Sequence, residues 1–311
     1  MKKIFYIAVS LITTLSTHPQ HAAGSDKPTP VASSPELGVL LFGDQGDGDE
    51  GQKHVANAMK RFCQTTRCDF GLILGDNFYP NGVRGADDPQ FKSAFEEPYS
   101  PLAIPFYAVL GNHDYGYLGV KGNIQAQVDY TQKSKFWKMP ARYYAFEEKG
   151  VQFVALDTVA LEDEVQQEEW MVATLNESKA KYKVVFGHFP IHSGGIHGDT
   201  PFMRKYISPL LCGRASVYVS GHDHDLQHLK TDCGVPLVVS GAASSHRVVL
   251  DTKQSEFSKS TLGFAYLTMN SAGELKVSYV NDQLQTLAIF PLPAAGAVGS
   301  SKINRKQKLS K

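Results

Sequence analysis

The sequence predicts an α/β fold in which two mixed β-sheets pack face to face and helices cover their outer sides. The first observation is that five apolar or β-branched runs between residues 38 and 220 are each followed by a glycine. The second is that strands and helices alternate up to residue 224, whereas the rest of the chain is rich in strands alone. Alternating units favour parallel strands and consecutive strands favour antiparallel pairing, so both kinds of pairing are expected.

The part before residue 224 is predicted to contain strands, helices and one hairpin. The strands are the five apolar runs, at residues 38–42, 70–74, 107–110, 182–186 and 216–220. Helices are expected over residues 52–62, 91–99 and 164–178, the first because Ala58 and Phe62 lie at helical spacing. The segments 141–146 and 151–157 are separated by Glu147-Glu148-Lys149-Gly150, which is a hairpin signal.

The part after residue 224 is predicted to be strand-rich. Its expected strands lie at residues 235–240, 247–250, 263–269, 275–279 and 284–290. At the other end of the chain, residues 24–36 are rich in Pro, Ser and Thr and are interpreted as a linker. One folded domain is therefore expected over residues 37–292.

The first 23 residues have the pattern of a secretory signal peptide. Lys2 and Lys3 precede an apolar run over residues 4–15 and a polar stretch that ends at Ala23. The run is too short to span a bilayer comfortably as a helix. The protein is therefore expected to be exported, either periplasmic or secreted, with an uncleaved amphipathic anchor as the alternative.

The formal charge of the 311 residues is +0, but basic residues concentrate at the two ends. Residues 1–23 and 301–311 hold seven Lys or Arg and no Asp or Glu, which leaves 24 basic and 31 acidic residues between them. An acidic body of this kind argues against nucleic-acid binding. Residues 293–311 are expected to form a disordered basic tail, with contact to an anionic membrane surface as the alternative.

Four cysteines in an exported chain favour disulfides. The local pairings are Cys63 with Cys68 and Cys212 with Cys233, although three connectivities exist and the sequence does not choose among them. Free buried thiols are the alternative for Cys212 and Cys233. The cysteines lack the close Cys/His spacing of a zinc knot and are not expected as metal ligands.

Side chains of metal-ligand type follow the ends of the five predicted strands. They are Asp44, Asp76, Asn112, His188 and His222, with Tyr79 and His224 a few residues further along the chain. Because α/β sheets place ligands at the carboxyl ends of their strands, these seven side chains are expected to converge. One shared carboxylate can hold two ions about 3.5–4 Å apart, and we expect Asp76 to be that bridge.

The seven side chains divide into two unlike donor sets. The first set consists of Asp44, Asp76, Tyr79 and His224. The second set consists of Asp76, Asn112, His188 and His222. A phenol with a pKa near ~10 is a poor ligand for a divalent ion at acidic or neutral pH, so Tyr79 predicts a trivalent ion such as Fe³⁺ in the first set. The second set is richer in nitrogen and suits Fe²⁺, Zn²⁺ or Mn²⁺.

The expected charges point to the substrate. Ions of +3 and +2 against three anionic ligands leave about +2, which is enough to hold a hydroxide and a phosphate oxygen. A trivalent ion is expected to lower the pKa of bound water below the ~7 typical of zinc-bound water, so hydroxide would persist in acid. Hydrolysis of phosphate esters at low pH is therefore expected.

With these residues in place, the chain resembles the purple acid phosphatases of the metallophosphoesterase superfamily, above all the small, tartrate-resistant kind. The family's five blocks stand here as Asp44-Gln45-Gly46, Gly75-Asp76-Asn77-Phe78-Tyr79, Gly111-Asn112-His113-Asp114, Val185-Phe186-Gly187-His188 and Gly221-His222-Asp223-His224. The similarity covers roughly residues 38–290. It implies the four-layer αββα sandwich of the superfamily and a binuclear metal centre held by the seven residues above.

The resemblance also implies roles for nearby residues. His113 and His197 would contact the substrate phosphate or protonate the leaving group, with His192 as the competitor of His197. Asp114 could orient His113. Asp157 is interpreted as a structural residue that caps a turn.

Two departures from the family pattern stand out. The segment 158–164 is short where animal members carry a long exposed loop, so control of activity by cleavage of that loop is not expected. Gln45 replaces an aromatic residue that is common at its position, which predicts a different rim of the phosphate pocket.

The expected function is that of an acid phosphatase. A metal-bound hydroxide at a binuclear Fe³⁺–M²⁺ centre would attack phosphate monoesters, either small molecules or phosphoproteins, in a monomeric protein. A phosphodiesterase, including one for cyclic nucleotides, with two divalent metals is the first alternative. A non-enzymatic phosphate-binding surface protein is the second. Tyr79 argues against the first, and the intact donor set argues against the second.

Overall fold

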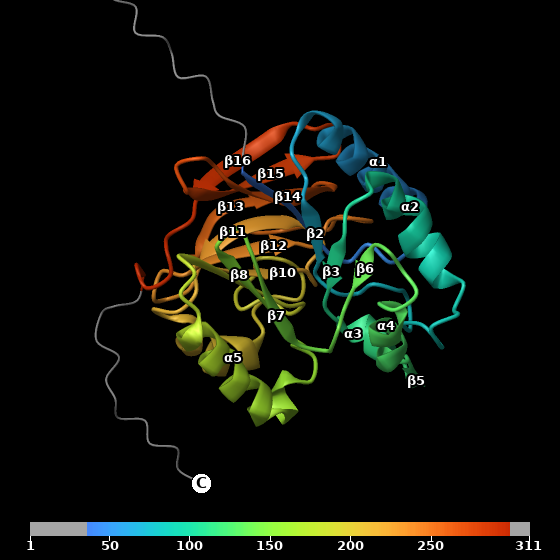
Figure 1. The fold of residues 1–311 in the computed structure, drawn as a ribbon, viewed down its shortest axis with the longest axis horizontal. Helices are drawn as coiled ribbons and strands as arrows, with labels where there is room; N and C mark the ends of the chain where they lie inside the picture. Colours follow the sequence, from blue (N-terminus) through green and yellow to red (C-terminus); the bar gives the residue numbers. More distant parts are fainter. Residues whose placement is uncertain (1–35, 299–311) are drawn as a thin grey trace, which may run out of the picture. The chain divides into compact units, whose positions relative to one another are not determined.

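The computed structural model describes residues 36–298, which form two seven-stranded mixed β-sheets with helices on their outer sides (Figure 1). The predicted fold class is confirmed. The predicted signal peptide over residues 1–23 and most of the predicted linker lie outside the described residues. So does the tail from residue 299 onward.

The first sheet has β1 near its middle. In spatial order it consists of β16 (Thr286–Pro291), β15 (Leu275–Asn281), β14 (Gly263–Met269), β1 (Leu37–Phe42), β2 (Phe70–Ile73), β3 (Phe106–Ala108) and β6 (Trp137–Lys138). Pairing from β1 to β6 is parallel, whereas β1 pairs with β14 in the antiparallel sense. The carboxyl ends of β1, β2 and β3 therefore lie at one edge.

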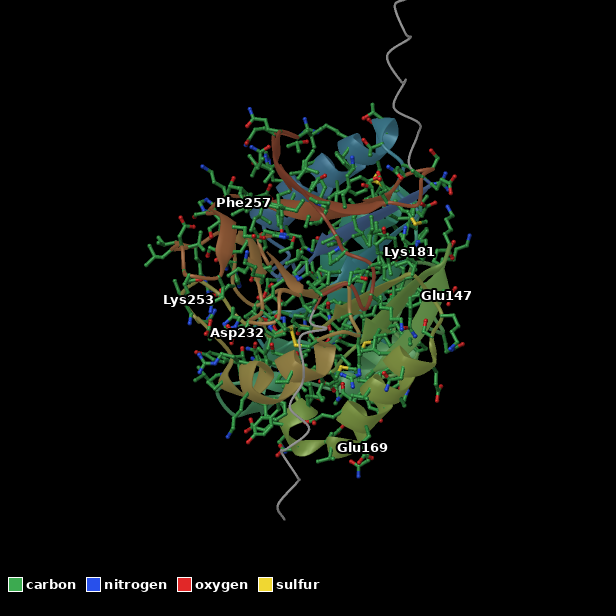
Figure 2. The ribbon with its side chains drawn as sticks, turned by 90° about the vertical axis from the view of Figure 1, so that its left-hand side faces the viewer. Glu147, Glu169, Lys181, Asp232, Lys253 and Phe257 are labelled. Carbon is green, nitrogen blue, oxygen red and sulfur yellow. A yellow bond between two sulfur atoms is a disulfide. The ribbon has the colours of Figure 1, made fainter. Side chains whose placement is uncertain are left out.

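The second sheet repeats this division into parallel and antiparallel strands. In spatial order it consists of β13 (Ser255–Lys259), β11 (Leu226–Lys230), β12 (Pro236–Ser240), β10 (Val217–Ser220), β9 (Tyr182–Phe186), β8 (Val151–Ala155) and β7 (Tyr144–Glu148). Strands β8, β9, β10 and β12 are parallel. Figure 2 shows the two edge strands at opposite sides of the view, marked by Phe257 on β13 and Glu147 on β7.

The core lies between the sheets because alternate residues of the strands face it. In the second sheet, Val217 and Val219 of β10 belong to the large core that includes β1 and β2, whereas Tyr218 between them belongs to the outer cluster. That outer cluster also contains Met171 and Leu211, which come from helices. The parallel strands are thus buried on both faces, which explains why they appear in the sequence as continuous apolar runs.

Helices cover both outer faces. On the first sheet, α1 (Glu50–Thr65) begins at Asp49, whose side chain accepts a hydrogen bond from the backbone N–H of Gln52. Phe62 of this helix packs against Phe264 of β14 with ring centroids 5.4 Å apart. The helices of the second sheet are α5 (Val165–Glu177), the π-helix η4 (Met203–Ile207) and α6 (Ser208–Leu211).

The remaining short elements connect the strands. They are η1 (Phe91–Glu96), α2 (Glu97–Tyr99), η2 (Ser100–Leu102), α3 (Asn112–Tyr115), β4 (Gly116–Tyr117), β5 (Val120–Lys121), α4 (Ile124–Tyr130) and η3 (Leu161–Asp163). The helix predicted over 91–99 is therefore divided into a π-helical and an α-helical part. Pro98 has no N–H to donate, which interrupts a continuous α-helical hydrogen-bond ladder there.

One predicted strand is wrong, and five strands were not predicted, namely the two-residue strands β4, β5 and β6 and the longer strands β11 and β13. Residues 247–250 form a loop, in which the Arg247 N–H donates to the carbonyl of His224 and the Leu250 N–H donates to that of Gly194. These bonds tie the segment to other loops and leave it without a strand partner. The strands β11 and β13 escaped prediction because their polar residues interrupt the apolar pattern.

The folded body extends beyond the predicted boundary at residue 292. The Ala295 N–H donates to the carbonyl of Lys181 at 2.9 Å, and the Gly213 N–H donates to the carbonyl of Val298 at 3.0 Å. Residues 293–298 of the predicted disordered tail are therefore part of the fold.

The disulfides join Cys63 to Cys68 and Cys212 to Cys233, which are the two local pairings. Both join segments within one sheet layer: the first closes the end of α1, and the second links α6 to the turn after β11. Within residues 36–298, no helix combines the length and apolar character needed to cross a membrane.

The buried His228 on β11 is expected to make the stability of the fold depend on pH. Its ring is buried, stacks on Phe290 at 3.9 Å, and places Nδ1 3.0 Å from the Tyr279 hydroxyl. Burial lowers the pKa of His228 to about 4. Because the folded-state pKa lies below the ordinary value of ~6.5, the folded state loses stability as pH falls from about 6.5 to 4.

We expect His228→Gln to weaken this acid-induced loss, with a difference on the order of 2–3 kcal/mol in the free energy of unfolding at pH 4 relative to pH 7. Urea unfolding at a series of pH values measures it. His246→Gln is the matched control, since His246 is exposed. Parallel pH profiles of wild type and His228→Gln would contradict the prediction.

Candidate metal centre

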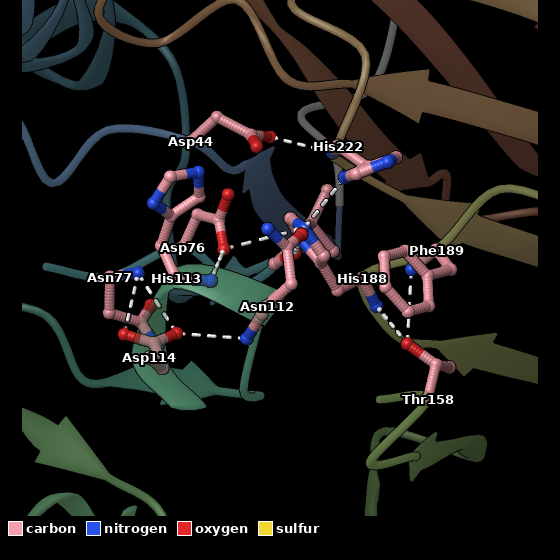
Figure 3. Close-up of polar contacts among 12 residues, drawn as sticks. Asp44, Asp76, Asn77, Asn112, His113, Asp114, Thr158, His188, Phe189 and His222 are labelled. Atoms are coloured by element: carbon pink, nitrogen blue, oxygen red, sulfur yellow. Dashed lines mark hydrogen bonds and ion pairs between the residues drawn. The ribbon is translucent and has the colours of Figure 1, made fainter. Parts of the chain in front are cut away.

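The seven predicted donor side chains come together where the parallel strands of the two sheets end. Three of them, Asp44, Asp76 and His222, have left-handed backbones with φ of 59°, 51° and 72°. Such backbones are uncommon for residues with a Cβ and turn the chain sharply at the strand ends. Figure 3 shows five of the seven donors as labelled side chains in one cluster.

Backbone amides hold the two carboxylates in place. The His222 N–H donates to Asp44 Oδ2 and the His113 N–H donates to Asp76 Oδ1, both at 2.8 Å (Figure 3). The other oxygen of each carboxylate, Asp44 Oδ1 and Asp76 Oδ2, faces the Tyr79 hydroxyl. The carboxylates are thus oriented by residues that follow other strands.

The first donor set surrounds the Tyr79 hydroxyl. This oxygen lies 3.0 Å from Asp76 Oδ2, 3.4 Å from Asp44 Oδ1 and 3.4 Å from His224 Nε2. His224 Nε2 lies 3.7 Å from Asp44 Oδ1, while its Nδ1 pairs with the Ser245 hydroxyl at 2.6 Å. Four donor atoms therefore share one small space, as the sequence predicts.

The second donor set surrounds His188 Nε2. This nitrogen lies 3.0 Å from Asn112 Oδ1, 3.2 Å from His222 Nδ1 and 3.5 Å from Asp76 Oδ1. Ligand atoms of Asp76, His188 and His222 all lie within 4.8 Å of one another. Asp76 is common to both sets, with Oδ2 toward Tyr79 and Oδ1 toward His188.

The protonation of His188 shows that this set fits a cation. His188 Nδ1 lies 2.8 Å from the carbonyl oxygen of Leu74, which can only accept, so Nδ1 carries the hydrogen. Nε2 then presents a lone pair, and its neighbours Asn112 Oδ1 and Asp76 Oδ1 present lone pairs as well. A metal ion satisfies such a convergence of acceptors, and the Leu74 bond fixes the ring in the orientation that a ligand needs.

Burial makes the first set hard to ionise without a cation. Burial raises the pKa of Asp44 well above its ordinary value, and the charge of Asp76 raises it further. Burial likewise raises the pKa of Tyr79, with Asp44 and Asp76 adding to the shift. A bound cation would remove this cost by pairing with the anionic oxygens.

The imidazoles of the cluster remain neutral, as metal ligands must be. Burial lowers the pKa of His188 and of His222. Burial, followed by the nearby charge of Arg247, lowers the pKa of His224 to about 4. Their nitrogens therefore keep lone pairs available in mildly acidic solution.

A pocket of about 420 Å³ opens over the donors. Its lining consists of Asp76, Asn112, His113, Tyr117, His197, His222, His224 and Arg247. Its volume is that of a small-molecule site. Both donor sets can therefore be reached by a small ligand from one side.

His113 lies in the pocket, but Asp114 does not orient it as predicted. The ring Nδ1 of His113 lies 2.8 Å from the carbonyl oxygen of Pro80, which leaves Nε2 for the pocket. The buried Asp114 carboxylate instead accepts hydrogen bonds from the backbone N–H groups of Gly111 and Asn77 and from Gln127. The short helix α3 turns the Asp114 side chain inward, where it fixes the loop that carries Asn77.

His197 lines the pocket, whereas its competitor His192 does not. The Asp223 carboxylate oxygen Oδ1 lies 2.9 Å from His197 Nδ1 and accepts the His197 backbone N–H at 3.0 Å. The His197 ring packs against the His222 ring, tilted by 31°, with centroids 4.2 Å apart. His192 is buried and pairs with Asp199 at 3.0 Å.

Asp157 and Gln45 lie outside the pocket lining. Asp157 accepts the Ala160 N–H at 3.4 Å and pairs with Arg142 at 3.0 Å, which fits the predicted structural role. Gln45 is buried and its amide donates to the Asn77 side chain at 3.4 Å. The rim that the sequence assigned to Gln45 is formed by other residues.

Sequence reasoning missed Arg247 and Tyr117 as pocket residues. Arg247 was assigned to a strand, yet it lies on the loop after β12, which runs parallel to β10. The signal that could have identified it is position, because loops after parallel strands face the same edge as the donors. Tyr117 lies after Asn112 and His113 on the β4–β5 hairpin, and its ring centroid is 5.2 Å from that of His113.

Several known proteins resemble this chain in sequence. Residues 37–226 match the calcineurin-like phosphoesterase family. The chain is 35% identical to mouse tartrate-resistant acid phosphatase type 5 over 69% of this chain and 74% of that protein. It is 31% identical to the human protein of the same name, over 84% and 92% of the two chains. It is 30% identical to Arabidopsis thaliana purple acid phosphatase 3, over 78% and 72%.

Two solved structures share the fold. The Plasmodium protein GAP50, an anchor in the inner membrane complex, matches with a TM-score of 0.74 at 24% identity, over 83% of this chain and 89% of that one. The purple acid phosphatase PPD1 of yellow lupin seeds matches with a TM-score of 0.69 at 17% identity, over 86% and 55%. At these identities the likeness concerns the fold alone.

Proposed function

The chain belongs to the calcineurin-like phosphoesterases and, among them, to the purple acid phosphatases, so it is a phosphatase; we propose that it hydrolyses phosphate monoesters in acid at a binuclear Fe³⁺–M²⁺ centre. The observation that carries this proposal is the Tyr79 hydroxyl, 3.0 Å from the carboxylate that both donor sets share. The divalent ion is Fe²⁺, Zn²⁺ or Mn²⁺.

The surroundings of Tyr79 favour a trivalent ion in the first set. The phenol is enclosed with two carboxylates, and burial together with those carboxylates raises its pKa. Only a strongly acidic cation displaces a proton held in this way. The second set offers two imidazoles, one amide and the shared carboxylate, which suit a divalent ion.

When bound, the two cations supply a nucleophile by lowering the pKa of water, and they neutralise charge on the phosphate. The chain's own residues do the rest. With Nδ1 held by the Pro80 carbonyl, His113 presents Nε2 to the pocket and can hold the proton that the leaving oxygen needs. His197, held by Asp223, is the second group in position for this transfer.

Arg247 positions the substrate. Its backbone N–H is tied to the carbonyl of His224, so the residue is fixed beside the first donor set. Within residues 36–298, no carboxylate forms an ion pair with its guanidinium, although this group lines the pocket. A phosphate oxygen is the anion that it can pair with there.

The proposed substrates are small phosphate esters and phosphoproteins, and the proposed location is outside the cytoplasm. The leader pattern of residues 1–23 supports export. The two disulfides support an oxidising compartment. We propose a monomer.

The function is tested with 4-nitrophenyl phosphate across pH. We expect faster hydrolysis at pH 5 than at pH 8, and a loss of about 100-fold or more in kcat/KM in Asp76→Asn, because both cations lose their shared carboxylate. Metal analysis should show fewer bound ions per chain in that variant. Asp225→Asn is the matched control, since Asp225 is buried next to His224 but outside the pocket lining. Equal rates of wild type and Asp76→Asn would refute the proposed function.

The trivalent ion is tested by the colour of the protein. We expect iron-loaded wild type to absorb visible light through its phenolate, and Tyr79→Phe to lack this band. Tyr117→Phe should keep the band, because its hydroxyl lies outside both donor sets. A colourless protein that is fully active with zinc or manganese alone, and that prefers bis(4-nitrophenyl) phosphate, would instead favour the phosphodiesterase.

The role of Arg247 is tested by separating KM from kcat. We expect Arg247→Gln to raise KM for 4-nitrophenyl phosphate about tenfold with kcat changed less than about twofold, as loss of one charge-assisted hydrogen bond predicts. Arg214→Gln serves as control, because Arg214 pairs with Asn176 away from the pocket. An unchanged KM would show that the guanidinium does not contact the phosphate.

A further inference from the structure

Most of the exposed large apolar side chains lie on loops that also line the pocket. Among residues 36–298, nine large apolar side chains are exposed, and six of them lie on three loops that also line the pocket. The six are Tyr117, Leu118, Val120, Ile196, Val248 and Leu250. The other three are Val165, Tyr206 and Ile289, none of which belongs to a loop that contributes to the lining.

Each of the three loops places one residue with a polar group in the pocket lining and carries further exposed apolar residues next to it in the chain. The β4–β5 hairpin places Tyr117 in the lining and Leu118 at its tip, where the side chain is 84% exposed. Figure 1 shows β5 beside α3 and α4 at the margin of the fold. Ile196 precedes His197 in the same way, and Val248 follows Arg247.

The last two of these loops are joined. The Leu250 N–H donates to the carbonyl of Gly194 at 2.9 Å, and the Arg247 N–H donates to the carbonyl of His224 at 2.8 Å. The exposed Val248 and Leu250, at 67% and 69%, are therefore held close to the segment that carries Ile196. We call the six exposed apolar side chains the apolar mouth. On these two loops it is held by backbone hydrogen bonds close to the donors.

This distribution of polar and apolar side chains indicates a ligand that has one polar and one apolar part. Single exposed apolar residues are ordinary, but a cluster around a polar pocket marks a ligand-binding surface. Apart from the metal donors, the pocket is lined by His113, His197 and Arg247, which suit a phosphate, whereas the mouth offers aliphatic side chains. A small leaving group would remain within the pocket and would leave Leu118, Val248 and Leu250 uncovered.

We propose that, among small phosphate esters, this site prefers the phosphate monoesters of long-chain alcohols, whose alkyl chain lies against the apolar mouth. The inference rests on the proposed phosphatase function. Water adds to phosphorus, the bond from phosphorus to the chain-bearing oxygen breaks, and that oxygen takes a proton. The products are the free alcohol and inorganic phosphate. The ligand is a single amphiphile molecule held by its phosphate.

The test is a series of n-alkyl phosphates from ethyl to octyl, each assayed below its critical micelle concentration. We expect kcat/KM of the wild type to rise about twofold per methylene. Full burial of a methylene would give roughly fourfold, and a chain on an open surface is covered on one side only. In the triple variant Leu118→Ser, Val248→Ser, Leu250→Ser, we expect less than about 1.3-fold per methylene, with the ethyl phosphate rate kept within about twofold.

The matched control is the triple variant Val165→Ser, Tyr206→Ser, Ile289→Ser, which removes the three exposed apolar side chains away from the mouth and should keep the wild-type slope. A flat series in wild type with normal turnover of ethyl phosphate overturns this inference and leaves the proposed function standing. Equal loss of slope in both triple variants overturns it as well. The same phosphates are also assayed in the presence of phospholipid vesicles. A chain-length effect that appears only with the vesicles overturns the inference too, because the surface would then bind a membrane. Absence of turnover for every phosphate monoester would instead refute the proposed function.

Discussion

The carboxylate of Asp76 is the group on which the rest of the site depends. Its Oδ1 accepts the His113 N–H and faces His188, while its Oδ2 faces Tyr79. The neighbouring backbone must come very close to permit this. A Cβ at Gly111 would collide with the Asp76 amide nitrogen and Oδ1, and a Cβ at Gly221 would collide with Asp44 Oδ2. Gly111, which precedes Asn112, and Gly221, which precedes His222, thus each make room for a carboxylate that follows another strand.

Burying these donor side chains costs free energy when no cation is bound. Two carboxylates, a phenol and three imidazoles share a buried volume, and burial shifts the pKa of Asp44 and Tyr79 upward and those of the histidines downward. Every one of these shifts disfavours a charged side chain. Cations that accept the oxygen and nitrogen lone pairs reverse the balance, so metal binding and the stability of this edge are coupled.

The donor side chains inside the site and the exposed side chains around it are held in different ways. Inside, hydrogen bonds from outside the donor sets fix several donors, as the Leu74 carbonyl does for His188 and the Ser245 hydroxyl for His224. At the mouth, the exposed apolar side chains of residues 196, 248 and 250 stand on loops that are held by hydrogen bonds of their neighbours, such as the Leu250 N–H to the Gly194 carbonyl and the His197 N–H to Asp223. The interior therefore determines the reaction, and the loops can determine which leaving group is accepted.

The sequence by itself determined the fold class, the parallel strands and the seven side chains that meet at their ends. These follow from local patterns, because an apolar run, a glycine and a polar residue in succession indicate a buried strand and the loop that follows it.

Tertiary structure decided which partner each remaining group has. Pro80, 33 positions before His113 in the chain, and not the adjacent Asp114, holds the His113 ring. Asp223, 26 positions after His197, holds that histidine in the pocket. The loop bonds of Arg247 place a residue at the site that its local sequence assigned to a strand. Such choices depend on contacts between segments far apart in the chain, and local sequence carries no information about which of those contacts the packed sheets will allow.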